Sequence, residues 1–90
     1  MSDIEADAAE FRKHLVDLAW KPDEWADEGE ICFEWIAPDR HAIVSVEGDG
    51  EIGYSMLVDG KFVPGVEAAR PGRLPADLGP YLLVPPKEIV

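Results

Sequence analysis

The feature that most limits the folds open to this chain is a series of three turn signals between residues 31 and 66. Pro38-Asp39-Arg40-His41, Asp49-Gly50 and Asp59-Gly60 separate four segments rich in β-branched and aromatic residues. Aspartate followed by glycine is typical of tight hairpin turns, which need positive φ angles. Consecutive strands joined by such short loops pair antiparallel. We therefore predict a four-stranded antiparallel β-meander with strands over residues 31–37, 42–47, 51–58 and 61–66.

The residues before the meander have the pattern of an amphipathic helix. Apolar side chains recur every three or four positions along one stripe, at Ile4, Ala8, Phe11, Leu15 and Leu18. We predict an α-helix over residues 3–20, which Pro22 prevents from continuing. An acidic linker over 21–30 and a Pro-rich C-terminal tail over 67–90 complete the chain. The predicted fold class is α+β, a single domain over 1–90 with the helix packed on the meander.

The strand register decides which face of the sheet meets the helix. If Asp49-Gly50 and Asp59-Gly60 are two-residue turns and residues 38–41 form a four-residue loop, Trp35 pairs with Val44. The helix is then expected to cover a face that holds Ile31, Phe33, Trp35, Val44, Val46, Leu57 and Phe62. The opposite face holds Cys32, Glu34, Ile36, Ile43, Ser45, Ile52, Tyr54, Met56 and Val63. A bulged turn at 48–50 would shift the register and exchange the two faces.

This opposite face is too apolar to meet water alone, and two interpretations stay open. In the first, the tail around residues 81–84 covers it. In the second, it contacts a partner or a second copy of the chain, with Ile43, Tyr54 and Met56 at the centre of that interface.

The charge is strongly negative and unevenly distributed. The net charge is −11, and residues 1–60 hold sixteen acids and four bases, whereas 61–90 hold three acids and four bases. Such a surface repels nucleic acid and anionic membranes and attracts a basic protein. A simpler interpretation is that the acids keep the protein in solution. The candidate partner-binding residues are Asp3, Asp7, Glu10 and Asp17 along the helix, then Asp23, Glu24, Trp25, Asp27 and Glu28.

No motif carries catalysis or cofactor binding. Residues 48–53 match G-x-G-x-x-G, but a strand follows instead of a helix, and acids occupy the loop. His14, His41 and Cys32 lie in different elements without the spacing of a metal site. We predict no enzymatic activity, no catalytic residues, no cofactor and no metal. Because the chain shows neither a secretory signal nor an apolar run of roughly 20 residues, we expect it in the cytoplasm of a bacterial cell.

Residues 28–58 carry a recognisable pattern. Gly29-Glu30-Ile31-Cys32-Phe33-Glu34-Trp35 is a strand that ends in Glu-Trp, and Gly48-Asp49-Gly50 followed by Tyr54 is a hairpin. The pattern resembles small uncharacterised bacterial and phage proteins with a helix and a β-meander. In size and acidity, the chain is similar by type to phage anti-CRISPR and other anti-defence inhibitors, although no functional residue carries over.

The net charge of −12 over residues 1–60 leads us to predict a non-enzymatic acidic binding module. It would occupy a basic, nucleic-acid-binding surface of its target, as a phage-type inhibitor would, and would not itself bind nucleic acid. The alternative is an antitoxin-like or self-assembling accessory protein, a homodimer included, that binds through the apolar sheet face.

Overall fold

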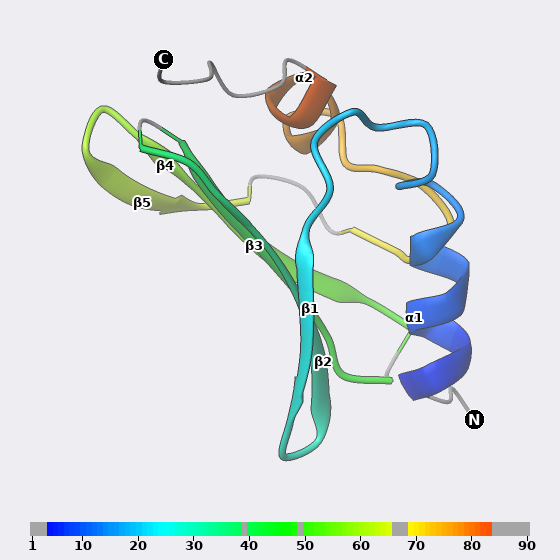
Figure 1. The fold of residues 1–90 in the computed structure, drawn as a ribbon. Helices are drawn as coiled ribbons and strands as arrows, with labels where there is room; N and C mark the ends of the chain where they lie inside the picture. The colour runs from blue at the N-terminus through cyan, green and yellow to red at the C-terminus, as the bar shows by residue number, and fades with distance from the viewer. Residues whose placement is uncertain (1–3, 39, 49, 66–68, 84–90) are drawn as a thin grey trace.

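The fold is a single antiparallel sheet with helices packed on one side (Figure 1). The computed structural model describes residues 4–38, 40–48, 50–65 and 69–83. Within these ranges, each of the five strands pairs with the next along the chain, in the order β1-β2-β3-β4-β5. The elements are α1 Ile4–Arg12, β1 Asp23–Asp27, β2 Glu30–Ile36, β3 His41–Val46, β4 Ile52–Val58, β5 Lys61–Pro64 and α2 Leu78–Leu83.

The prediction of α+β class is confirmed, but the sheet has five strands where four were expected. The additional strand, β1, lies inside the predicted acidic linker. It forms a hairpin with β2 in which Asp27 pairs with Glu30, so Glu28 and Gly29 make the turn. Gly29 has a φ of 72°, a conformation that glycine adopts at low cost.

The helix α1 ends at Arg12, so the predicted helix over 3–20 is too long. Turns continue the chain, with Leu15 N donating to the carbonyl of Arg12 at 3.0 Å and Leu18 N donating to that of Leu15 at 3.1 Å. The Nζ of Lys21 also donates to the carbonyl of Leu15, at 3.0 Å. These contacts satisfy the carbonyl groups left free at a helix end. Phe11, Leu15 and Leu18 are all buried, so the predicted apolar stripe still reaches the core.

The β3–β4 loop is wider than predicted, and this exchanges the two faces of β4. Val46 pairs with Ile52, which leaves residues 47–51 as the loop. Because five residues lie between this pair, the connection is not a two-residue turn, and Gly48 and Gly50 within it have positive φ angles of 83° and 85°. The shift of one residue turns Ile52, Tyr54 and Met56 into the core and leaves Gly53, Ser55 and Leu57 on the other side. This register buries three large apolar side chains, whereas the predicted one would bury Leu57 alone.

Of the other two predicted registers, one differs by two residues and the other is confirmed. Trp35 pairs with Ala42 instead of Val44. This is a shift of two residues, which keeps the same face. Leu57 pairs with Phe62, as predicted. However, because β4 is turned over, this pair lies on the face away from α1.

The core lies between the helices and the face of the sheet that we call the inner face. Phe33, Trp35 and Val44 from this face are almost fully buried, together with Phe11 of α1. The indole Nε1 of Trp35 donates to the carbonyl of Trp20 at 3.0 Å, so this buried polar group is satisfied.

The described part of the tail packs on the inner face, which also carries α1, and not on the opposite face as one interpretation expected. Within its described part, Ile52 N donates to the carbonyl of Ala69 at 3.0 Å, and Leu78 and Leu82 of α2 are fully buried. The hydroxyl of Tyr81 donates to the carbonyl of Leu57 at 2.7 Å. Both helices therefore cover one side of the sheet, as Figure 1 shows.

Candidate interaction surface

The face of the sheet away from α1 and α2 is the main candidate surface, and we call it the outer face. None of the described helices or loops packs over it (Figure 1). Alternate residues of each strand contribute to it, and the register fixes which ones. They are Asp23, Trp25, Asp27, Glu30, Cys32, Glu34, Ile36, His41, Ile43, Ser45, Gly53, Ser55, Leu57, Phe62 and Pro64.

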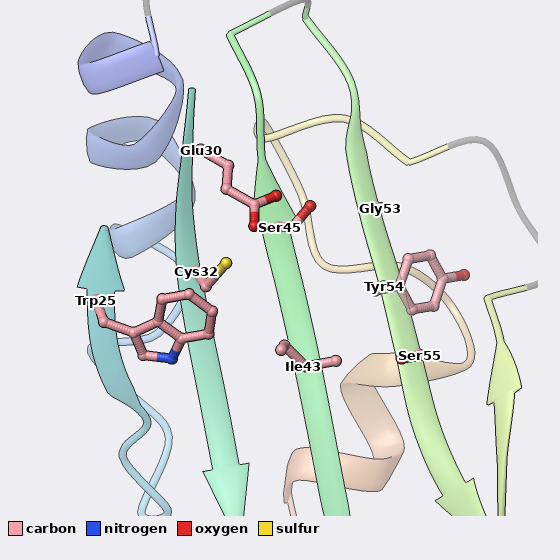
Figure 2. A pocket seen from close by; sticks show the side chains of 8 residues that line it. All are labelled: Trp25, Glu30, Cys32, Ile43, Ser45, Gly53, Tyr54 and Ser55. Carbon is pink, nitrogen blue, oxygen red and sulfur yellow. The ribbon is translucent and has the colours of Figure 1, made fainter. Parts of the chain in front are cut away.

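A shallow hollow of about 250 Å³ lies on the part of the outer face nearest β1. Figure 2 shows the indole of Trp25, the thiol of Cys32 and the side chain of Ile43 across three neighbouring strands, with Glu30 and Ser45 beside them. Three consecutive residues of β4, Gly53, Tyr54 and Ser55, complete its lining. Apolar groups thus line the hollow, and a carboxylate stands at its side.

Cys32 is the nucleophilic group at this hollow, but its environment suppresses its reactivity. Burial, followed by a hydrogen bond to Glu30, raises the pKa of the Cys32 thiol to about 11. The negative charges of Asp27 and Glu34 act in the same direction. Since the thiolate is the reactive form, this thiol is a weak nucleophile at neutral pH.

The acids of β1 and β2 surround Trp25 on the outer face. In the ladder, Trp25 pairs with Cys32, Asp23 pairs with Glu34, and Asp27 pairs with Glu30. Trp25 is 39% exposed. The indole is therefore flanked by two pairs of carboxylates that lie directly across from each other.

The other end of the outer face is apolar. Ile36 and Phe62 are 58% and 52% exposed. The ring of Phe62 stands edge-on to His41, with 5.0 Å between the ring centroids. The Nε2 of His41 lies 2.5 Å from a carboxylate oxygen of Glu34. His41 and Glu34 thus mark the border between the apolar end and the acidic end.

Of the four acids predicted along the helix, two lie in α1, namely Asp7 and Glu10. Asp3 lies outside the described residues, and Asp17 is exposed in the turns after α1. Asp7 accepts a hydrogen bond from Gly50 N at 3.2 Å, which ties α1 to the β3–β4 loop. Glu10 forms an ion pair with Lys13, at 3.2 Å.

Among the acids predicted beyond the helix, Glu24 points to the opposite side from its neighbours. Its carboxylate takes two hydrogen bonds from the guanidinium of Arg12, at 2.6 and 2.8 Å. These hydrogen bonds lower the pKa of Glu24. Glu28 is exposed in the β1–β2 turn. The structure therefore brings Asp23, Trp25 and Asp27 together and separates them from Glu24.

The alternative interface predicted at Ile43, Tyr54 and Met56 is wrong as a single surface. Ile43 lies on the outer face, whereas Tyr54 and Met56 are buried in the core. The hydroxyl of Tyr54 donates to Asp77 Oδ1 at 2.5 Å. The outer-face residues missed from the sequence include Glu30, which precedes the strand predicted over 31–37. They also include Leu57 and Phe62, whose side depends on the β4 register.

Within the described residues, no group of three or more His, Cys, Asp or Glu side chains is placed to hold a metal ion. No helix in this part of the chain is both long enough and apolar enough to cross a membrane. Comparisons with protein-family models, curated proteins and solved structures found no match to this chain. The resemblance to phage inhibitors, the absence of enzymatic activity and the cellular location therefore stay predictions.

Proposed function

We propose that this protein is a non-enzymatic binding module that docks through its outer face onto a basic surface of another protein. The observation that carries the proposal is the exposed indole of Trp25, set between carboxylates on a sheet face that no described element covers. Aromatic side chains of this kind contribute strongly to binding when a partner removes them from water. The net charge of −11 selects a partner of the opposite sign.

In its finer form, the proposal is that the partner surface otherwise holds nucleic acid, as the target of a phage-type inhibitor would. Arginine forks accept carboxylates and phosphates alike. The carboxylates of Asp23, Asp27, Glu30 and Glu34 lie on one face, so they could engage several arginines of such a surface together. Binding of the protein and binding of nucleic acid would then exclude each other.

The test compares two double variants with the same net charge. Asp23→Lys with Asp27→Lys reverses charge on the outer face, whereas Glu10→Lys with Asp17→Lys reverses it elsewhere. Fluorescence anisotropy measures binding to labelled poly-arginine, and a second assay measures displacement of a DNA oligonucleotide from it. We expect the outer-face variant to bind at least tenfold more weakly and the control to change less than threefold. Equal losses would show that only overall charge matters and would overturn the proposal.

The second candidate function is self-assembly or an antitoxin-like contact through the apolar end of the outer face. The exposure of Ile36 and Phe62 favours it. Sedimentation equilibrium of the wild type and of Phe62→Asp tests it. A concentration-dependent mass that Phe62→Asp abolishes supports self-assembly, and a monomer at all concentrations contradicts it.

A further inference from the structure

Among the described strands, β1 pairs with β2 alone, so one side of its backbone has no partner strand in this part of the chain. It lies at the edge of the sheet, and all five of its residues are exposed. An edge strand pairs on one side only, so alternate N–H and C=O groups point away from the sheet. These groups form a template onto which another extended chain can add.

The side chains of β1 differ between its two sides. Asp23, Trp25 and Asp27 lie on the outer face, roughly 6.6–6.8 Å apart along the strand because alternate residues share a face. On the inner side, Glu24 is already bound by Arg12, and Ala26 is small. The charge available to a new strand is therefore on the outer face.

Carboxylates face each other across the β1–β2 ladder on both sides of Trp25. Asp23 lies directly across from Glu34, and Asp27 from Glu30. Like charges directly opposite in a ladder are destabilising. Glu34 is already paired with His41 and Glu30 is hydrogen-bonded to Cys32, whereas none of the ion pairs between described residues includes Asp23 or Asp27. A cation placed beside each pair would relieve this repulsion, which gives basic side chains an advantage at these two positions.

The same charges argue against a second copy of this chain at the β1 edge. Two β1 strands paired antiparallel about Trp25 would set Asp23 of each copy against Asp27 of the other. The opposite edge of the sheet is less suited to a new strand, because Pro64 in β5 has no N–H to donate and Lys61 would repel a basic segment.

We propose that β1 accepts an extended segment of a partner protein as a sixth strand, with Lys or Arg at alternate positions on the outer face. Two of these side chains would face Asp23 and Asp27, and an arginine between them would stack on the indole of Trp25. Cross-strand neighbours lie about 4.5–5.5 Å apart at Cβ, within reach of both contacts. This inference rests on the proposed function and specifies which part of the basic partner docks, namely an extended segment that pairs with β1.

The test uses four capped seven-residue peptides on the wild-type protein. One alternates arginine with threonine, and one has the same composition with the arginines in a block. The other two are the alternating peptide with N-methyl groups on one or the other of its two sets of alternate amides. Titration calorimetry measures the affinities. We expect the alternating peptide to bind at least tenfold more tightly than the block. N-methyl groups on the amides that point toward β1 should abolish the tighter binding of the alternating peptide. N-methyl groups on the amides that point away from β1 should preserve it.

Variants of the protein locate the site. Trp25→Ala and Asp23→Asn with Asp27→Asn should each remove most of the preference for the alternating peptide. The matched pair Glu10→Gln with Asp17→Asn should retain it. Circular dichroism confirms that each variant is folded.

Two outcomes separate this inference from the proposed function. If all basic peptides bind equally, regardless of arrangement and N-methylation, the sixth strand is overturned while docking to a basic partner stands. If the affinity for the peptides and the affinity for poly-arginine are both independent of the outer-face acids, the sixth strand and the proposed function are both overturned.

Discussion

At the scale of single residues, Tyr54 joins three parts of the molecule. Its ring lies against Gly65, whose N donates to the carbonyl of Tyr54 at 2.8 Å, and its hydroxyl donates to Asp77 in the C-terminal segment. A Cβ atom added at Gly65 would lie 2.2 Å from the Tyr54 ring. The absence of a side chain at residue 65 is therefore what allows the ring to occupy this place.

Gly65→Ala should destabilise the protein, because the new methyl group displaces the Tyr54 ring. Such overpacking costs about 1–3 kcal/mol. Gly72→Ala is the control, since no atom lies within 4 Å of its added Cβ. Urea unfolding followed by circular dichroism gives both free energies. A loss at Gly65 no larger than at Gly72 would show that the ring moves aside freely.

At the scale of elements, the Arg12–Glu24 pair joins the end of α1 to the edge strand β1. Both side chains are partly exposed, at 45% and 40%, so the pair is worth about 0.2–1 kcal/mol. Its role is to fix one face of β1 against the helical layer, which leaves Trp25 on the other face of the strand.

The stability that this pair provides should depend on pH. The hydrogen bonds from Arg12 lower the pKa of Glu24 in the folded protein. The stabilisation is therefore present above the pKa of the unfolded chain and is lost as the pH falls through the lowered value. Glu24→Gln should reduce the unfolding free energy by up to about 1 kcal/mol at pH 7, with the difference vanishing in acid. Asp17→Asn, at an exposed turn, should show no such pH-dependent difference.

The sequence predicted the later strands well because their limits are set by local turn residues. Asp59-Gly60, for example, has the two positive φ angles that its composition indicates. It missed β1, because Asp-Glu-Trp-Ala-Asp lacks the alternation of a half-buried strand, and only pairing with β2 makes it one.

The candidate surface was predicted in part, for the same reason. The composition around Trp25 identified Asp23 and Asp27. It could not place Glu30 or Phe62, because their side of the sheet depends on the hairpin at Gly29 and on the width of the β3–β4 loop.

At the scale of the whole molecule, both ends of the chain build the helical layer. Phe11 of α1 and Leu78 and Leu82 of α2 are fully buried against one sheet face. The sequence predicted that the apolar tail would lie against the sheet. Which face of the sheet the tail covers depends on the β4 register, because this register places Tyr54 and Met56 on the inner face, where the tail packs.

Shortening the side chain of Leu82 should therefore lower the unfolding free energy of the whole domain. Leu82→Ala should cost about 2–5 kcal/mol, the range for a buried leucine. The neighbouring Leu83 is 63% exposed, and Leu83→Ala should change the unfolding free energy by about 0.5 kcal/mol or less. Thermal and urea unfolding measure both. Similar values for the two variants would mean that α2 is not part of the cooperative core.

The order of the elements along the chain has a consequence for folding. The segment that carries α2 follows the meander, so residues C-terminal to the sheet complete the cover of its inner face. In a partly folded state in which the sheet has formed and α2 has not yet docked, the apolar residues of the inner face are unshielded and β1 lies at the edge of the sheet. The carboxylates along that edge then act as gatekeepers that discourage aggregation between partly folded chains.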